Sequence, residues 1–147
     1  MLREALTQEL VAVGLPGRTK NDVIETLLDL LCTTGKIRDR ERALADILAN
    51  EARMSTGLEQ GIAIPHAKTG AVDELVACVA VTANKIDFES IDHKPARIFI
   101  MTLSPPGDTG PHVQFLAEVS RLLKNKKARQ KVLEARDASE LYSLLTG

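Results

Sequence analysis

The chain is poor in aromatic residues and carries no excess charge of either sign. Its 147 residues include three Phe, one Tyr and no Trp, and its formal net charge is −1. So few aromatic side chains exclude a platform on which nucleic-acid bases stack. The balanced charge gives no electrostatic footprint for nucleic acid or anionic lipid. We therefore expect no nucleic-acid partner.

Long apolar runs and abundant cysteine are also lacking. The longest uninterrupted apolar run extends from Leu75 to Val81, whereas a membrane-spanning helix needs roughly 20 apolar residues. The first residues, Met1 to Glu4, do not have the pattern of a signal peptide. Cys32 and Cys78 lie in apolar segments and are too few for a disulfide scaffold. We expect a cytoplasmic protein with no membrane insertion and with two buried, reduced thiols.

The apolar pattern changes its period along the chain and predicts an α/β fold. Helical spacing predicts a helix over residues 20–33 with Thr19 as N-cap, and a second from Asp39 to the Ser55-Thr56-Gly57 break, both on one sheet face. Short, partly β-branched runs predict strands over 61–64, 75–83 and 97–103, with 10–15 a further candidate. Helical spacing returns over 111–124, 126–135 and 139–146. A single domain over residues 1–147, a three-layer α/β/α sandwich, buries these faces most economically.

One imidazole follows an apolar run and a proline. In Gly61-Ile62-Ala63-Ile64-Pro65-His66-Ala67, Pro65 fixes its own backbone φ and biases Ile64 toward an extended conformation. A neutral imidazole keeps a lone pair on one ring nitrogen, so it can attack phosphorus or carbon. His66 is therefore the candidate nucleophile. The alternative is a structural histidine.

A second histidine, His112, lies at the start of a predicted helix. Gly110 or Thr109 can serve as its N-cap, and Pro111 suits the first helical position. His112 shares a helix face with Phe115 and so points inward. The positive end of the helix dipole disfavours an imidazolium, so we expect a lowered pKa and a neutral ring that donates to a phosphoryl oxygen. The alternative is a core histidine with its hydrogen bond satisfied.

The chain resembles the fructose/mannitol-type enzyme IIA domains of the phosphoenolpyruvate-dependent phosphotransferase system. Three ordered blocks carry this resemblance: Met54 to Lys68, Ile86 to Pro95, and His112 to Leu123. It implies a mixed β-sheet flanked by helices on both faces. It also implies that His66 takes a phosphoryl group from the histidine phosphocarrier protein and passes it to a cysteine or histidine of a IIB partner, with His112 in support. Neither a cofactor nor a metal is expected.

One position departs from the pattern of that family. The family usually has arginine in a Leu-x-Arg-Glu segment before Ser-Thr-Gly, and the corresponding segment in this chain is Leu48-Ala49-Asn50-Glu51. A guanidinium binds phosphate oxygens through charge-assisted hydrogen bonds, whereas Asn50 offers only neutral amide donors. We expect Arg53 and Lys68 to join Asn50 as the phosphate-binding residues. At Glu59 the family commonly has glycine, so this chain has an additional negative charge near the expected approach to His66.

Two further functions stay open at this point. A regulatory module similar to the nitrogen-branch relatives would use phosphorylation, which adds about −1.5 to −2 charges, to control its binding to regulatory target proteins. A metal hydrolase would use His66, His93 and His112, but no recognised ligand spacing joins them. His93 is expected to be exposed in the turn Asp92-His93-Lys94-Pro95. The chain also has no Walker-type loop, so we do not expect it to use ATP directly.

Overall fold

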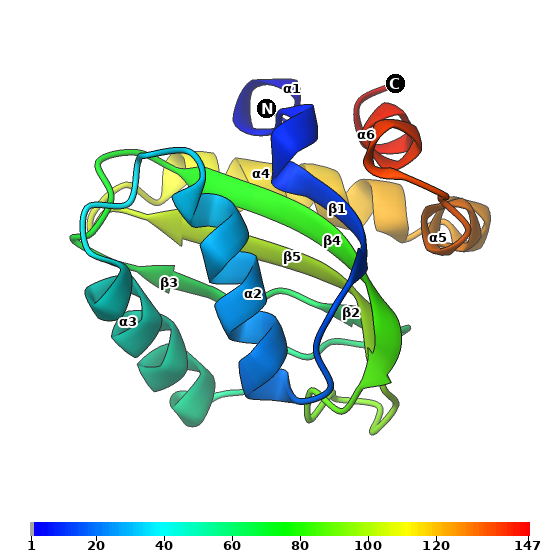
Figure 1. Ribbon diagram of the computed structural model, residues 1–147, viewed down its shortest axis with the longest axis horizontal. Coiled ribbons are helices and arrows are strands. Elements are labelled where there is room, and N and C mark those ends of the chain that lie inside the picture. Colours follow the sequence, from blue (N-terminus) through cyan, green and yellow to red (C-terminus); the bar gives the residue numbers. More distant parts are fainter. Residues whose placement is uncertain (1) are drawn as a thin grey trace.

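A computed structural model describes residues 2–147 as a mixed sheet between layers of helices (Figure 1). The helices are α1 (Leu2–Ala5), α2 (Lys20–Cys32), α3 (Arg40–Arg53), α4 (Gly110–Leu123), α5 (Lys126–Leu133) and α6 (Ala138–Thr146), with a short 3-10 helix, η1 (Gln8–Leu10). The strands are β1 (Val11–Leu15), β2 (Ile62–Ala63), β3 (His66–Lys68), β4 (Val76–Ile86) and β5 (Ala96–Ser104). The expected α/β class is confirmed.

The sheet is mixed, as the resemblance implied, and one of its edges is broken. Its order is β1-β4-β5-β2, in which β4 and β5 are antiparallel and β1 runs parallel to β4. Both β2 and β3 pair with β5 in the parallel sense, Ala63 opposite Phe99 and His66 opposite Thr102. Ile64 and Pro65 therefore interrupt what is otherwise a single edge strand. The sequence placed His66 after a strand, but it is the first residue of β3.

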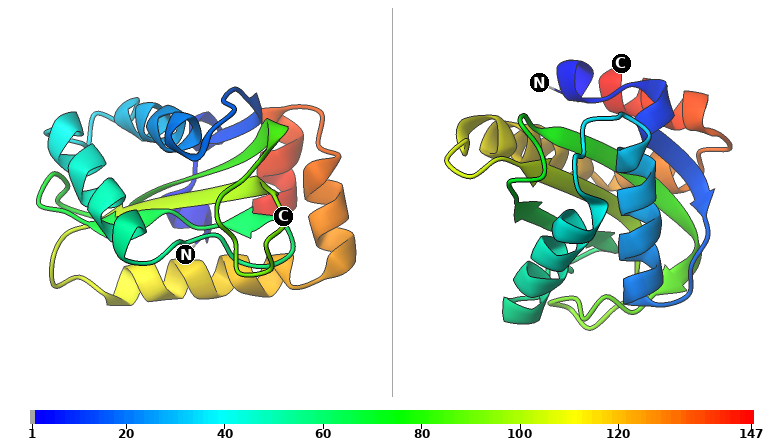
Figure 2. Two further views of the ribbon diagram at one scale, coloured as in Figure 1. Left: turned by 90° about the horizontal axis from the view of Figure 1, so that it is seen from below. Right: turned by 60° about the vertical axis from the view of Figure 1, so that its left-hand side comes forward.

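Helices cover both faces of this sheet. Figure 2 shows α2 and α3 together on one face and α4 on the other, which confirms the expected three layers and the shared face of the first two helices. The predicted N-caps are also confirmed: the Thr19 hydroxyl accepts from the Asp22 N–H, and the Asp39 carboxylate accepts from the Arg42 N–H. Helix α6 packs on β1, which brings the two ends of the chain close together (Figure 1).

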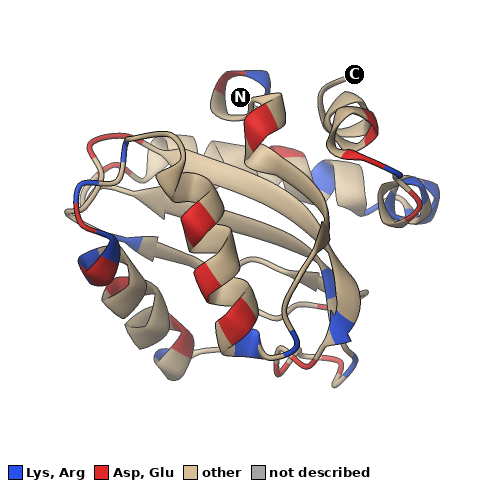
Figure 3. Ribbon diagram, viewed as in Figure 1, with Lys and Arg blue, Asp and Glu red and all other residues tan. Residues whose placement is uncertain are grey.

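The core lies along β4 and β5, where the sequence is most apolar. Phe88, Phe99 and Phe115 are fully buried, and the charged residues lie on helices, loops and strand ends (Figure 3). Cys78 is buried, and burial raises the pKa of its thiol to about 12. Cys32 is also a free thiol, but it is only partly buried because it lies at the C-terminal end of α2. The expectation of two buried thiols is confirmed for Cys78, whereas Cys32 is only partly buried.

Two short elements and one helix start differ from the prediction. The three residues of β3 contain no β-branched side chain, and their conformation comes from pairing with β5. One-turn helices such as α1 carry too little periodicity to be predicted. At α4 the N-cap is Thr109 and Gly110 is already helical, so Pro111 occupies the second helical position instead of the first.

Candidate functional site

His66 is held by the backbone just before it. Its Nδ1 lies 2.7 Å from the carbonyl oxygen of Ile64. A carbonyl can only accept, so Nδ1 carries the proton and donates it, and the lone pair is left on Nε2. The side chain is half-buried. The ring is thus restricted to one tautomer, with Nε2 as its nucleophilic nitrogen.

The loop before His66 is fixed by a buried carboxylate. Ile64 donates its N–H to the Thr56 carbonyl at 3.0 Å, and Thr56 donates its own N–H to Glu51 Oε1 at 2.6 Å and its hydroxyl at 2.5 Å. Glu51 is buried, and Lys20 Nζ lies 3.8 Å from Oε2. Glu51 lies in the last turn of α3, four residues before Ser55 of the Ser-Thr-Gly turn, and its role in holding this loop was not predicted from the sequence.

His112 lies in the first turn of α4, beside His66. The two ring centroids are 5.3 Å apart, with the ring planes tilted by 39°. The hydroxyl of Thr102 lies 3.1 Å from His112 Nδ1. Burial lowers the pKa of His112, and the positive charges of His66 and Lys68 lower it further. The predicted direction of the pKa shift is confirmed, with burial as its largest cause and the neighbouring cations adding to it.

Asn50 joins His66 to an arginine. Its Nδ2 donates to the backbone carbonyl of His66 at 3.0 Å, and its Oδ1 accepts from Arg53 Nη2 at 2.8 Å. Both polar atoms of the amide are thus engaged within the protein. Asn50 thereby connects the His66 backbone to the guanidinium of Arg53, and it also lines the pocket that contains both histidines.

One pocket brings together all five residues that the sequence singled out. Its volume is about 540 Å³, and it is lined by Asp46, Ala49, Asn50, Arg53, His66, Ala67, Lys68, Ser104 and His112. Sequence analysis missed Asp46 and Ser104. The Ser104 hydroxyl is buried, and in the part of the chain that the structure describes it has no hydrogen-bond partner. Two histidines, two cations and amide and hydroxyl groups therefore surround a space suited to an anion.

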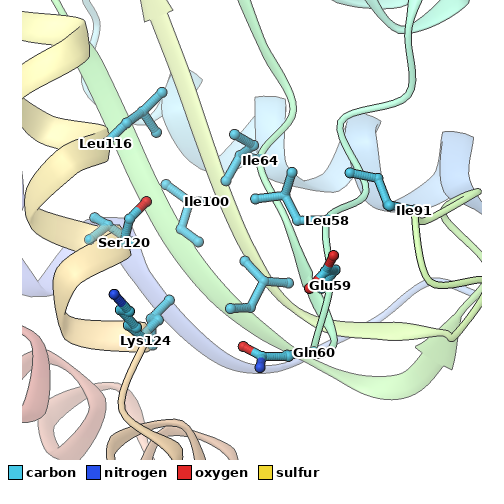
Figure 4. A pocket seen from close by; sticks show the side chains of 12 residues that line it. Leu58, Glu59, Gln60, Ile64, Ile91, Ile100, Leu116, Ser120 and Lys124 are labelled. Carbon is cyan, nitrogen blue, oxygen red and sulfur yellow. The ribbon is translucent and has the colours of Figure 1, made fainter.

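A second pocket, of about 360 Å³, is mainly apolar and shares no lining residue with the first. Figure 4 shows Leu116 and Ser120 from α4, with Lys124 just after its end, on one side and Leu58, Glu59 and Gln60 on the other. Leu58 and Ile64 line both this pocket and a third pocket, of about 430 Å³, which is also lined by His66 and Arg53. Glu59 thus lies at the apolar pocket, whereas the pocket that holds both histidines is lined by other residues.

The third histidine lies away from this site. His93 is exposed and has a positive φ of 60°, in the turn where the sequence placed it. Among residues 2–147, no group of three or more His, Cys, Asp or Glu side chains could hold a metal ion. Over the same residues, no helix has the length and apolar character needed to cross a membrane.

Comparisons of sequence give consistent matches. Residues 4–147 match the family described as "Phosphoenolpyruvate-dependent sugar phosphotransferase system, EIIA 2". The "PTS system fructose-specific EIIA component" of Haloferax volcanii is 39% identical, over 93% of this chain and 89% of that protein. A "Nitrogen regulatory protein" of Bradyrhizobium diazoefficiens is 30% identical, over 89% of this chain and 87% of that protein.

Solved structures of other proteins superpose on nearly the whole of this chain. Nitrogen regulatory protein IIA-Ntr from Neisseria meningitidis superposes with a TM-score of 0.84 at 26% identity, covering 97% of each chain. Enzyme IIA for mannitol from Escherichia coli, in its complex with phosphorylated enzyme IIB, gives a TM-score of 0.83 at 19% identity, again over 97% of each chain. At that identity the second match shows a shared fold.

Proposed function

Because this chain belongs to the EIIA 2 family of the phosphoenolpyruvate-dependent sugar phosphotransferase system, we propose that it accepts a phosphoryl group on His66 and passes it on. The donor is the histidine phosphocarrier protein, and the acceptor is a IIB protein or domain. One observation carries the proposal: the 2.7 Å contact between His66 Nδ1 and the Ile64 carbonyl. That contact leaves the lone pair on Nε2 for attack on phosphorus.

The transfer exchanges one N–P bond for another. His66 Nε2 attacks the phosphorus of the donor phosphohistidine in line, while the bond to the donor nitrogen breaks and its electron pair returns to the donor ring. The positive charge that develops on the His66 ring is stabilised by the hydrogen bond from Nδ1–H to Ile64. In the second transfer, the nucleophile of IIB attacks and His66 is the leaving group. The exchange balances without a metal, a nucleotide or a bound cofactor.

The other residues of the pocket are proposed to bind the phosphoryl oxygens. His112 donates a hydrogen bond, and Arg53 and Lys68 supply positive charge. Asn50 acts mainly through Arg53, because its amide oxygen already accepts from that guanidinium. Arg53 therefore takes the role of the arginine that the family usually has at position 50.

This function extends to the whole chain. We propose residues 1–147 as one IIA domain, in line with the family match over residues 4–147. A IIA component works where phosphoenolpyruvate supplies the phosphoryl group, so we place this one in the cytoplasm. A fructose-type sugar is the favoured destination of the phosphoryl group, because the Haloferax relative is named for it.

A labelling experiment tests this function. The protein is incubated with labelled phosphoenolpyruvate, enzyme I and the histidine phosphocarrier protein, and a fructose-type IIB protein is added afterwards. We expect label on the wild-type protein, its passage to IIB, and none on His66→Ala. The matched control is His93→Ala, which removes an exposed turn histidine and is expected to keep full labelling. Undiminished labelling of His66→Ala contradicts the proposal.

A regulatory role is the second candidate, and the similarity to a nitrogen regulatory protein favours it. In that case phosphorylation of His66 would add about −1.5 to −2 charges at the pocket and so change which proteins bind. The same experiment separates the two roles. Prompt transfer of label to IIB supports sugar transport, whereas a stable phosphorylated state that IIB does not discharge supports regulation.

A further inference from the structure

A buried threonine, Thr102, lies between the two histidines of the pocket. In β5 it is the residue paired with His66 of β3, and its hydroxyl oxygen is 3.1 Å from His112 Nδ1. Its side chain is fully buried. Thr102 is a polar residue within the apolar run of β5, but the sequence alone gives it no partner. We propose that Thr102 is a positioning residue that fixes the tautomer of His112.

The direction of this hydrogen bond follows from what the hydroxyl needs. A threonine hydroxyl has one proton to donate, and a buried donor left without an acceptor is unfavourable. Among the described residues, the hydrogen bonds of the Thr102 side chain lead only to His112 Nδ1. If Nδ1 carried a proton and donated to Thr102, the hydroxyl proton would be buried without an acceptor. Thr102 therefore donates, and His112 Nδ1 accepts.

A neutral imidazole that accepts at Nδ1 carries its proton on Nε2. Burial favours this neutral ring, since it lowers the pKa of His112. His66 has the opposite arrangement, because its Nδ1 donates to Ile64. The pair thus offers a lone pair at Nε2 of His66 and an N–H at Nε2 of His112, with the ring centroids 5.3 Å apart. One ring is set to form the bond to phosphorus and the other to donate to a phosphoryl oxygen.

With the opposite tautomer, His112 could not assist. Its Nε2 would then present a lone pair to the phosphoryl oxygens, which are themselves hydrogen-bond acceptors, and the two would repel. The kinetic part of this inference rests on the proposed phosphocarrier function. The tautomer itself depends only on the contacts within the unphosphorylated protein, so it can be measured separately.

The first test is NMR of the unphosphorylated protein with isotope-labelled histidine, above the usual histidine pKa of about 6.5. Ring-nitrogen chemical shifts distinguish protonated from unprotonated nitrogens. We expect His112 to be unprotonated at Nδ1 in the wild type and in Thr102→Ser, which keeps the hydroxyl. In Thr102→Val, which keeps the shape but loses the hydroxyl, we expect a substantial fraction to shift to the other tautomer.

Thr82→Val is the matched control. It removes another buried threonine hydroxyl, which donates to the Asn84 carbonyl at 2.6 Å, outside the histidine pocket. This variant should leave the His112 spectrum unchanged. If His112 of the wild-type protein is protonated at Nδ1, the proposal is overturned. This outcome is measured on the wild type alone, so it does not depend on whether any variant folds. A Thr102→Val protein whose His112 tautomer equals that of the wild type also overturns the proposal.

The second test is the rate of phosphorylation by the histidine phosphocarrier protein. We expect Thr102→Val to be phosphorylated about tenfold more slowly than the wild type. Complete loss of a hydrogen-bond donor to the transition state costs roughly 10²- to 10³-fold in rate, and this variant should lose only part of that. Thr102→Ser should restore most of the rate. If the tautomers are as expected but no protein is labelled, the phosphocarrier function fails and the assignment of Thr102 stands. If labelling is normal and Thr102→Val matches the wild type in rate, the role of Thr102 in transfer is wrong.

Discussion

The two histidines of the pocket are held in different ways. His66 is held through the backbone around it: its Nδ1 donates to the Ile64 carbonyl, and its own carbonyl accepts from the side-chain amide of Asn50. His112 lies on a regular helix, and a single side-chain hydroxyl, that of Thr102, fixes its ring. The orientation of His66, the proposed nucleophile, is thus supported by a folded loop, whereas the orientation of His112, its proposed helper, depends on one hydrogen bond. Four sets of measurements test this difference, in order of falling effect.

Removing each histidine in turn should give the largest contrast. His66→Gln is expected to abolish labelling, because no nucleophilic nitrogen remains. His112→Ala is expected to keep labelling but to slow it by roughly 10²- to 10³-fold, the usual cost of removing a donor to transition-state charge. Initial rates with the histidine phosphocarrier protein measure both. Equal losses in the two variants would mean that the division into nucleophile and helper is wrong.

Weakening the hydrogen bonds that hold the loop before His66 should change the His66 ring and leave His112 unaffected. Glu51→Gln removes a buried carboxylate that accepts from the N–H and hydroxyl of Thr56, and hydrogen bonds to charged groups contribute about 1.5–3 kcal/mol. We expect the free energy of unfolding in urea to fall by about 2–3 kcal/mol and the His66 ring to lose its single tautomer. Glu41→Gln, on the exposed face of the same helix, is the control and should be neutral. An unchanged His66 tautomer in Glu51→Gln would show that the Ile64 contact survives without this support.

Arg53 tests how the chain replaces the missing arginine. Arg53→Ala should slow phosphorylation by about tenfold, because one charge-assisted hydrogen bond to the phosphoryl group is lost. Asn50→Arg alone should gain little, since it breaks both contacts of the Asn50 amide. The double variant Asn50→Arg/Arg53→Ala should recover part of the rate by returning the cation to the family's position. A wild-type rate in Arg53→Ala would assign the role to Lys68.

The smallest expected effect is electrostatic and concerns His112. Because burial and the charges of His66 and Lys68 lower its pKa, the folded protein binds this proton less readily than the unfolded chain. The stability that this neutral ring confers is therefore present above about pH 6.5 and is lost as the pH falls below it. In an NMR titration, His66→Gln should move the pKa of His112 upward, toward the usual value. A His112 midpoint at or above that value in the wild type would contradict burial and neighbouring cations as the dominant influences on this ring.

The sequence predicted most of the structural features that follow from the spacing of apolar residues. The helices and the longer strands follow from periodicity and capping residues such as Thr19 and Asp39, and His66, His112 and Arg53 share the pocket as expected. What it could not predict depends on pairing between distant segments. The three residues of β3 form a strand only because β5 lies beside them, and Thr102 reads as one more residue of a buried strand until α4 places His112 against it.

The central claim is that Nε2 of His66 carries the phosphoryl group. The most direct measurement is heteronuclear NMR of the phosphorylated protein with isotope-labelled histidine, which identifies both the modified residue and the modified nitrogen. The hydrogen bond from Nδ1 to Ile64 predicts a single phosphohistidine, His66, with phosphorus bonded to Nε2. Phosphorus bonded to Nδ1 of His66, or to any other residue, would contradict the account.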